Sequence, residues 1–580
     1  MAPANFFLSP STVAQKQYEA LRMFFIDRRP AMEVAQHFGY SYRGFTTIVS
    51  NFRKDLKASN TRELFFTDKK KGRKRTGQMD AAKDIVIELR KKYLSVEDIK
   101  VTLDGKGYKL SEKSIYNIIS EEGFSRLPRR MKVVKQQMKV PRLAALKSIG
   151  LDFSEEDFKS SSGGILCFLP FLEKYGISKI IAASGYPETK TINRLSSILS
   201  FIALKLSSFR RYSADNLWCM DRGLGLFAGL NVLPKAAWFT SYSDRVTPQM
   251  NRDFLKAIHR KWAASGLLGD TANMDFTTVP YWGEDEQFEN NWSGKRGKAL
   301  SSMLAVLAHD PDTGIINYGD ADVTHSGQSG VVLEFLDFYR DATHAKDDLK
   351  YLVFDSKFTN YENLDKLNVQ GVKFITIRRR GKNLVNEINQ LSSSSWKTIR
   401  IECGGNKKRT LKIHDGQTFL KGYEGPIRQV FITGQGKIKP AIIITNDFDL
   451  GVEKIVRKYA KRWIVEKLIS EQIEFFHLNK VSSSMVIKVD FDLTMSILAH
   501  NIYRLLAREL QRYSNLSNQS IYEKFIRNTA DIQIENKEII VNLKKKRELP
   551  LVLQTMAEFD ALNYPWLNNK KIKFTGATYS

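Results

Sequence analysis

In the first part of the chain apolar residues recur every three to four positions, which is the spacing of amphipathic helices. They predict helices over Tyr18–Asp27, Pro30–Phe38 and Tyr42–Leu56, with a break at Gly39. A short helix, a glycine turn and a longer basic helix are typical of a helix-turn-helix DNA-binding unit, in which Ala35 would lie in the tight helix packing. The predicted DNA contacts near the start of the third helix are Arg43, Thr46 and Thr47. The alternative is a small helical bundle without a ligand.

A second stretch of helical spacing runs from Ala81 to about Phe124. Ser95 and Asp98 resemble a capping box, and Ser111 is a predicted N-cap. The helix after Ser111 would present Lys113, Tyr116 and Asn117 to DNA. Two such units in tandem favour DNA binding, because the interpretation as helical bundles without a ligand would have to account for the same pattern twice.

From about residue 266 the pattern changes to short apolar runs, which predict the strands of a mixed α/β sheet. A hairpin is predicted around the turn His309–Gly314, and further strands at Tyr351–Phe354, Lys373–Ile377 and Ala441–Thr445, with crossover helices between them. Residues 378–440 form short alternating segments separated by glycine, asparagine and aspartate, which predict a β-rich insertion. A small hairpin is predicted near the C-terminus, around Asn536 and Lys537.

The patterns predict several domains, because 580 residues are too many for one compact core. In chain order we expect a first helix-turn-helix domain (1–62), a basic linker (63–80), a second helix-turn-helix domain with a basic connector (81–147), a helical region (148–265), the first part of the α/β core (266–377), the β-rich insertion (378–440), the second part of the core (441–512) and a C-terminal region (513–580). Within the helical region, Pro234–Val246 is expected to connect two helices.

Lysine and arginine outnumber aspartate and glutamate by 90 to 63, which gives a formal charge of +27. Because 42% of the residues are hydrophobic, the chain is expected to be globular and not disordered. Its charge favours a polyanionic partner through attraction and counterion release, and nucleic acid is the leading candidate. An anionic membrane is the weaker alternative, because the basic residues recur along the whole chain and do not form one amphipathic helix.

The cysteines Cys167, Cys219 and Cys403 lie far apart, so the sequence supports neither a zinc knuckle nor a disulfide framework. The N-terminus lacks a basic region followed by an apolar core, and the most apolar stretch, Leu195–Phe209, is short and interrupted by Lys205. We therefore expect a reducing compartment, no export and no membrane-spanning segment.

A strongly basic run, Lys69–Arg75, lies between the two predicted DNA-binding units. It cannot pack into a core, so it is predicted to be a solvated linker. The alternative is an extended segment that lies in a narrow A·T-rich minor groove. The residues that would contact DNA there are Lys71, Arg73, Lys74 and Arg75. A second basic stretch, Arg126–Lys147, is expected to follow the DNA backbone and includes Arg129 and Arg130.

Three carboxylates in different segments are the candidate catalytic and metal-binding residues. Asp275 and Asp355 end short apolar runs that predict strands, whereas Glu466 lies on a long helical pattern. On that helix Tyr459, Arg462 and Glu466 are three and four residues apart and share one face, so Arg462 can orient Glu466 or hold a phosphate. Three carboxylates brought together can hold two divalent cations about 3.5–4 Å apart. Any one of them alone would more often be a cap, turn or solvated residue.

With this set of residues the chain resembles the DDE transposases of bacterial insertion sequences. The resemblance is to the group with a Tyr-x2-Arg-x3-Glu-x6-Lys signature and a β-rich insertion before the final glutamate, and it extends over roughly Phe168–Leu510. The residues that carry it are Asp275 with Thr277 and Thr278, Asp355 in Asp-Ser-Lys-Phe followed by Glu362-Asn-Leu364, and Thr445-Asn446 ahead of Tyr459, Arg462 and Glu466. The tandem N-terminal units look more like the end-binding domains of other cut-and-paste transposases.

The resemblance implies an RNase H-like core that holds two Mg²⁺ ions, which Mn²⁺ could replace, on Asp275, Asp355 and Glu466. It implies binding to the terminal inverted repeats of a DNA element and to target DNA, DNA cleavage and strand transfer, and a homodimer that holds both ends. It also implies a cytoplasmic, nucleoid-associated protein of a prokaryote. One position departs from the signature: Ile473 replaces the expected lysine, so that DNA contact would have to come from Lys467, His477 or Lys480.

Trp396 in the insertion is predicted either to stack on a displaced base at the cut end or to belong to the core of the insertion. Two other functions remain alternatives to transposition. The first is a catalytically silent DNA-binding regulator derived from a transposase, which the three intact carboxylates disfavour. The second is an RNase H-like nuclease without strand transfer, which the two N-terminal recognition units weakly disfavour.

Overall fold

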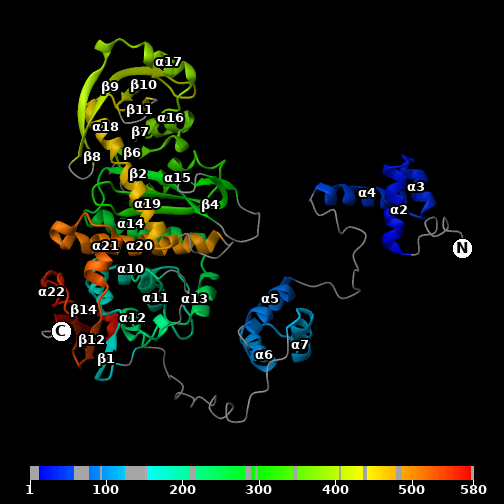
Figure 1. Cartoon of the computed structure of the whole chain (residues 1–580), viewed down its shortest axis with the longest axis horizontal. Coiled ribbons are helices and arrows are strands. Elements are labelled where there is room, and N and C mark those ends of the chain that lie inside the picture. Colours follow the sequence, from blue (N-terminus) through cyan, green and yellow to red (C-terminus); the bar gives the residue numbers. More distant parts are fainter. Residues whose placement is uncertain are drawn as a thin grey trace. The chain divides into compact units, whose positions relative to one another are not determined.

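The chain divides into two compact units, Met1–Arg142 and Leu143–Ser580, each of which is described by itself (Figure 1). The computed structural model describes residues 12–57, 77–91, 94–124, 151, 153–209, 217–280, 289–293, 298–343, 349–403, 407–434, 440–478 and 486–576. In these ranges no helix is both long and apolar enough to cross a membrane.

The first predicted group of helices in the smaller unit consists of α2 (Val13–Phe25), α3 (Ala31–His37) and α4 (Tyr42–Lys57). Their apolar faces form a shared core in which Ala35 is 1% exposed, as its position in the pattern predicted. Gly39 has a φ of +64° in the turn between α3 and α4, a conformation that glycine adopts without steric cost. The three predicted helices and their turn are therefore confirmed.

The second group consists of α5 (Gly77–Lys91), α6 (Val96–Gly105) and α7 (Glu112–Glu121). Ser95 forms the predicted capping box with Asp98, since each side chain accepts a hydrogen bond from the other residue's backbone N–H. Ser111 caps α7 by accepting a hydrogen bond from the Ser114 N–H at 3.1 Å. These caps satisfy N–H groups that the first turn of a helix leaves without partners.

A mixed sheet forms the centre of the larger unit, in the order β3-β4-β2-β6-β7-β11-β10-β9-β8, with β5 paired to β4. The first part of the sheet is antiparallel, whereas β2, β6 and β7 run parallel. The strands are β2 (Thr271–Pro280), β3 (Asn290–Ser293), β4 (Lys298–His309), β5 (Ile316–Val323), β6 (Tyr351–Phe354), β7 (Lys373–Ile377) and β11 (Ala441–Thr445). The predicted hairpin is confirmed, and so is the mixed α/β sheet.

The two faces of this sheet have separate cores. On one face, residues such as Met274 and Phe354 pack with α15 (Val331–Thr343) and α16 (Tyr361–Val369). On the other face, Val353 and Ile375 pack with Ile455 and Val456 of α18 (Val452–Ala460). Because side chains alternate between faces along a strand, neighbouring residues of β2 and β6 face different layers.

The β-rich insertion extends the central sheet and does not form a separate body. Its strands are β8 (Lys397–Cys403), β9 (Lys407–Phe419) and β10 (Pro426–Thr433), and β10 pairs with β11 in antiparallel register. The predicted strands are confirmed, but the segment begins with a helix, α17 (Lys382–Gln390), that the alternating pattern did not predict. Leu384 and Ile388 lie four residues apart on α17 and pack with Phe431 and Ile442, which explains the helix.

The predicted helical region and the C-terminal region share one hydrophobic core. The region contains α9 (Leu169–Lys174), α10 (Ile177–Ala183), α11 (Arg194–Leu206), α12 (Arg222–Phe227), α13 (Ala236–Ser243) and α14 (Pro248–Ala264). The expectation that Pro234–Val246 only connects helices was wrong, because α13 occupies most of it and buries Phe239 and Tyr242. The long helix α20 (Val486–Glu509) lies between this region and the central sheet (Figure 1).

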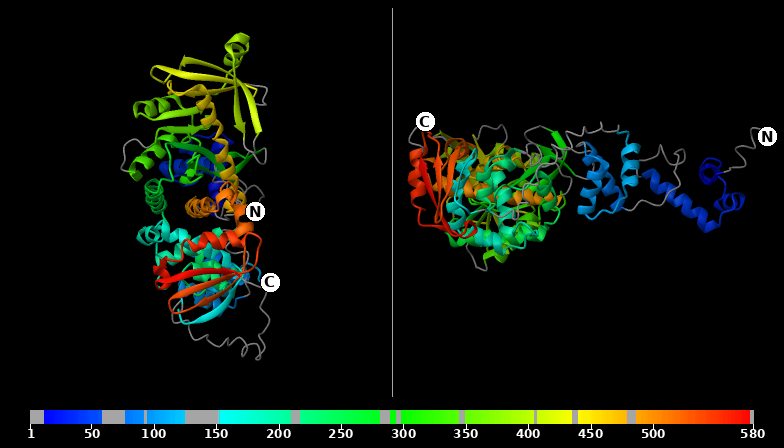
Figure 2. Two further views of the ribbon diagram at one scale, coloured as in Figure 1. Left: turned by 90° about the vertical axis from the view of Figure 1, so that its left-hand side faces the viewer. Right: turned by 90° about the horizontal axis from the view of Figure 1, so that it is seen from below.

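A second sheet joins the two ends of the larger unit. Its order is β1-β12-β13-β15-β14, so β1 (Glu156–Ser160), within the predicted helical region, pairs with β12 (Ala530–Ile534). The predicted C-terminal hairpin is confirmed as β12 with β13 (Glu538–Leu543), and the tail adds α22 (Leu549–Ala557), β14 (Asn563–Tyr564) and β15 (Lys570–Gly576). Figure 2 shows β1 beside these C-terminal strands, at the end of the unit opposite the insertion.

Gly164 lies where two backbone segments of this region touch. A Cβ atom at this position would come within 1.9 Å of the Ile526 carbonyl oxygen, a backbone atom that cannot rotate away. We expect Gly164→Ala to lower the free energy of unfolding by about 1–3 kcal/mol, the usual cost of overpacking. Urea unfolding followed by tryptophan fluorescence measures this change. In Gly381→Ala, where a Cβ atom has no neighbour within 4 Å, the loss should be smaller, and an equal loss would contradict the explanation.

Candidate active site

Two of the predicted carboxylates are neighbours in the central sheet. Strands β2 and β6 are parallel and their register pairs Met274 with Phe354. Asp275 follows Met274 within β2, and Asp355 follows Phe354, the last residue of β6, so the register places them side by side, both partly buried. The prediction that Asp275 ends its strand was wrong, because β2 pairs with β4 as far as Pro280. They lie on the sheet face that α18 covers, because Met274 and Phe354 pack on the opposite face.

A stacked aromatic pair holds the backbone next to both carboxylates. The rings of Phe276 and Phe358 have centroids 3.9 Å apart and an interplanar angle of 8°. Phe276 follows Asp275 directly, and Phe358 belongs to the short turn that follows Asp355. Both phenylalanines are buried, so this contact on the far face of the sheet restricts the distance between the two carboxylate-bearing segments.

The helix predicted to run without interruption through Tyr459 and Glu466 is two helices, α18 and α19 (Trp463–Glu474). At their junction the Arg462 N–H donates to the Tyr459 carbonyl at 3.0 Å, and the Ile464 N–H donates to the Lys461 carbonyl at 3.0 Å. These bonds span three residues and tighten the chain relative to an α-helix. The two side chains of the junction also pair with different segments, since Lys461 contacts Asp312 in the turn between β4 and β5 at 2.5 Å and Arg462 contacts Asp275 within β2. The prediction of one continuous helix was therefore wrong.

Arg462 is the centre of the charged cluster. Its Nη1 donates to the Asp275 Oδ2 at 2.6 Å, and only 8% of the Arg462 side chain and 13% of the Asp275 side chain are exposed. Burial opposes the charge on Arg462, but Tyr459, Asp275 and Asp355 together raise its pKa above the usual value. The negative charges of both Asp275 and Asp355 therefore stabilise the positive charge of Arg462.

Tyr459 lies beside Arg462, with the guanidinium carbon 5.5 Å from the centre of its ring. Burial raises the pKa of the Tyr459 phenol to about 12, against the influence of Arg462. The phenol is therefore neutral at physiological pH and can donate a hydrogen bond.

Glu466, the third predicted carboxylate, lies in the first turns of α19, which packs against β2 and β4. Its side chain lies outside the described part of the structure. Among the side chains that are described, no group of three or more acidic, histidine or cysteine residues could hold a metal ion. Asp275 and Asp355 themselves have the hard oxygen donors that Mg²⁺ prefers, and a cationic guanidinium already lies against Asp275. The donor chemistry therefore fits the predicted metal.

Asn273 belongs to the same face of β2 and was not singled out in the sequence. It is fully buried two residues before Asp275, and neither atom of its amide group has a hydrogen-bond partner among the described residues. The alternation of polar residues at 273, 275 and 277 with apolar residues between them was the signal for this polar face.

The predicted DNA contacts of the smaller unit lie at the solvent surface or outside the described residues. Arg43 and Thr47 are exposed at the start of α4, Thr46 is half-buried, and both threonine hydroxyls donate to the Arg43 carbonyl. The three contacts predicted on α7 are all exposed: Lys113, Tyr116 and Asn117. The remaining predicted contacts lie outside the described residues: Lys71, Arg73, Lys74, Arg75, Arg129 and Arg130.

In the larger unit, Trp396 is half-buried and packs against the cluster of Ile388, Phe431 and Ile442. It therefore contributes to the core of the insertion, while base stacking stays a prediction. Ile473 is half-buried on α19. Of the residues proposed to replace the missing lysine, Lys467 is exposed one residue after Glu466, His477 bonds to Ser208, and Lys480 lies outside the described residues.

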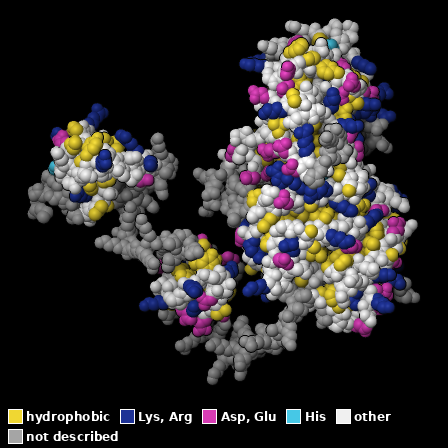
Figure 3. All heavy atoms as spheres, turned by 180° about the vertical axis from the view of Figure 1, so that it is seen from behind, with side chains coloured by type: hydrophobic (Ala, Val, Ile, Leu, Met, Phe, Trp, Pro, Cys, Tyr) yellow, Lys and Arg dark blue, Asp and Glu magenta, His cyan; other side chains and the backbone are white. Residues whose placement is uncertain are grey.

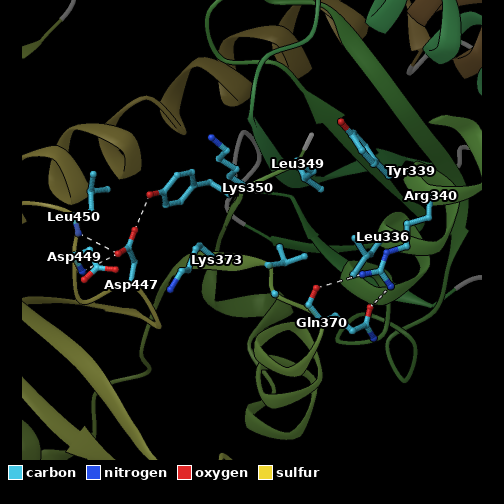
Figure 4. Close-up of a pocket in the computed structure, with 13 residues that line it drawn as sticks. Leu336, Tyr339, Arg340, Leu349, Lys350, Gln370, Lys373, Asp447, Asp449 and Leu450 are labelled. Atoms are coloured by element: carbon cyan, nitrogen blue, oxygen red, sulfur yellow. Dashed lines mark hydrogen bonds between the residues drawn. The ribbon is translucent and has the colours of Figure 1, made fainter. Parts of the chain in front are cut away.

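A cavity of about 820 Å³ lies at the N-terminal ends of the parallel strands β6 and β7 (Figure 4). Tyr351 and Lys373, the first residues of β6 and β7, line it, whereas Asp355 follows the last residue of β6. Its polar groups are largely paired with each other: Tyr351 donates to Asp447 at 2.6 Å, and Arg340 donates to Gln370 at 2.6 Å. The cavity therefore lies at the opposite end of β6 from Asp355 and is separate from the pair of Asp275 and Asp355.

The family model described as "Transposase DDE domain" matches residues 271–502, from β2 into α20. The matched segment includes Asp275, Asp355 and Glu466. Among solved structures, the chain is similar to one described as a cryo-EM structure of the piggyBac transposase synaptic complex with hairpin DNA. The identity is 11% and the TM-score 0.32, over 70% of this chain and 83% of that chain. No curated protein matches the sequence.

Proposed function

We propose that this protein is a DNA transposase that cuts a DNA element at its ends and joins the ends to target DNA. The observation that carries this proposal is the placement of Asp275 beside Asp355, with Arg462, from the junction of α18 and α19, paired with Asp275. The match of residues 271–502 to a transposase DDE domain supports it independently.

In this proposal Asp275, Asp355 and Glu466 hold two Mg²⁺ ions, and Mn²⁺ can replace them. Such ions, when bound, activate the attacking hydroxyl and stabilise the leaving oxygen of the phosphodiester. Tyr459 donates a hydrogen bond to the DNA strand, and Arg462 supplies a positive charge for a phosphate. Lys467, the exposed cation next to Glu466, takes the DNA contact that Ile473 cannot make.

We also propose that the catalytic core belongs to the RNase H-like class. The strand order β5-β4-β2-β6-β7 supports this, since three antiparallel strands are followed by two strands parallel to β2. In chain order these five strands are β2, β4, β5, β6 and β7. Asp275 lies on the first of them and Asp355 directly follows the fourth, and these two strands are adjacent in the sheet.

The smaller unit is proposed to bind the terminal inverted repeats through α4 and α7, with the protein acting as a homodimer. The exposed polar residues at the start of both helices support this assignment. On the face shown in Figure 3, lysine and arginine side chains are spread over the surface of each unit among aspartate and glutamate side chains.

The proposal is tested by mixing the full-length protein with Mg²⁺, a plasmid that carries its gene with the flanking genomic DNA, and a supercoiled target plasmid. Cleavage at two flanking positions followed by joining to the target supports transposition. Cleavage without joining would instead indicate a nuclease, and sequence-specific binding without cleavage would indicate a regulator.

Arg43 is predicted to read bases from the start of α4. The probes are a duplex selected by the full-length protein from a random library and a scrambled duplex, compared by fluorescence anisotropy at one salt concentration. We expect Arg43→Ala to weaken binding to the selected duplex by about 1–3 kcal/mol, the usual value of a base contact, with a smaller change for the scrambled duplex. The exposed Lys54 near the end of α4 is the control: Lys54→Ala should keep the preference between the duplexes. If Arg43→Ala and Lys54→Ala prefer the selected duplex over the scrambled one to the same extent, Arg43 does not read the base sequence.

A further inference from the structure

Arg462 occupies a position that a bound cation would need. One oxygen of Asp275, Oδ1, accepts the Phe276 N–H at 2.8 Å, and the other, Oδ2, accepts the Arg462 Nη1 at 2.6 Å. A divalent cation that binds Asp275 through Oδ2 must therefore share that oxygen with Arg462 or replace it. Two positive charges that contact the same carboxylate oxygen repel each other. The Arg462 contact therefore weakens the binding of a cation to Asp275, and a bound cation weakens the Arg462 contact.

The surroundings of Arg462 favour its present position when no other cation is near. The Arg462 side chain is 8% exposed, and both Asp275 and Asp355 act on its charge. Two partly buried carboxylates side by side are costly without a positive partner, since burial removes much of the water that would stabilise their charges. The Arg462 guanidinium provides that partner within the chain.

The position of Arg462 also allows it to leave. It lies in the junction between α18 and α19, and its neighbour Lys461 pairs with Asp312 of the β4–β5 turn independently of the carboxylates. A change of side-chain conformation at Arg462 therefore does not require either helix to unfold. Tyr459 provides an aromatic face next to the guanidinium.

We propose that Arg462 acts as a built-in counterion that closes the site without metal, and that divalent cation binding releases it from Asp275 to pair with a DNA phosphate. This inference rests on the proposed function, because it concerns the same carboxylates. It assigns Arg462 a positioning role in which metal binding precedes its contact with DNA. By linkage, metal and the DNA end then strengthen each other's binding.

The first test measures Mn²⁺ binding to the full-length protein without DNA, from the electron paramagnetic resonance signal of free Mn²⁺. Arg462→Gln, which loses the charge, should bind Mn²⁺ about tenfold more tightly than the wild type or better. Lys461→Gln is the matched control, because it loses the same charge one residue away, and its affinity should stay within about twofold. Unchanged or weaker binding in Arg462→Gln would overturn the inference.

A second measurement uses the wild-type protein and does not depend on how the variant folds. Phenylglyoxal modifies exposed arginines, and mass spectrometry locates the adducts. Arg462 should be protected without metal and become reactive with saturating Mn²⁺, whereas Arg457, 44% exposed on α18, should react equally in both states. Protection of Arg462 that persists with Mn²⁺ would overturn the inference.

The Asp355→Asn variant separates failure of this inference from failure of the proposed function. If Asp355→Asn weakens Mn²⁺ binding and Arg462→Gln does not strengthen it, the metal site stands and the role of Arg462 is refuted. If Asp355→Asn leaves Mn²⁺ binding unchanged, the metal does not bind at these carboxylates, and the proposed function and the inference are both refuted.

Discussion

Asp355→Asn should reduce DNA cleavage and joining by roughly 10³-fold, the scale on which the loss of one electrostatic group from a catalytic site acts. Asparagine has nearly the same shape as aspartate but lacks the charge that a divalent cation requires. The measurement is the rate of cleavage of the gene-flanking plasmid with Mg²⁺, with joined products counted separately.

The fold should survive this substitution. Among the described residues, the only hydrogen bonds that Asp355 accepts go to its backbone carbonyl, from Phe358 and Thr376, so the substitution removes a charge near Arg462 but no described hydrogen bond of the carboxylate. The control is Asp337→Asn, an exposed carboxylate on α15, which should cleave at the wild-type rate. Cleavage by Asp355→Asn at more than about a tenth of the wild-type rate would contradict its catalytic role.

Lys205→Met should destabilise the larger unit by about 3–5 kcal/mol, the cost of removing one partner from a buried ion pair. The Lys205 Nζ donates to the Asp492 Oδ2 at 2.7 Å and to the Phe476 carbonyl at 2.9 Å, and both charged side chains are less than a tenth exposed. Methionine fills a similar volume but leaves the Asp492 charge and the carbonyl buried without this donor. The loss is measured from the midpoint of urea unfolding.

A matched pair of variants tests the mechanism of this loss. Lys174 also connects the helical region to α20, through Glu509, but this pair is 41% and 26% exposed. Lys174→Met should therefore cost less than about 1 kcal/mol. The double variant Lys205→Met, Asp492→Leu should recover most of the stability, because it removes both buried charges. A double variant as unstable as Lys205→Met alone would show that packing, and not charge, explains the loss.

Three strands at the centre of the sheet were predictable from the sequence, because each is short and rich in apolar residues. Tyr351–Phe354, Lys373–Ile377 and Ala441–Thr445 agree with the observed strands β6, β7 and β11 at both ends. Most residues of these strands are buried, so apolar residues make up most of each strand. The register of β2 and β6 then follows from parallel pairing and not from either strand alone.

Other features had no local signal. Strand β1 is the polar segment Glu-Asp-Phe-Lys-Ser, and its partner β12 lies more than 350 residues later, with Phe158 opposite Ile532. The junction of α18 and α19 contains neither proline nor glycine, the residues by which a sequence usually marks a helix break. Both features depend on contacts with distant segments.

The sequence by itself determined which residue types carry the chemistry and in which kind of element each lies. It placed Asp275 and Asp355 at strands, Arg462 and Glu466 on a helical segment, and most of the DNA-binding candidates on helices or in basic linker segments, because spacing and polarity are local properties. Only the tertiary structure decided that Arg462 pairs with Asp275. The reason is that the ion pair joins residues 187 positions apart, and its strength depends on a burial that arises when α18 and α19 pack on the sheet.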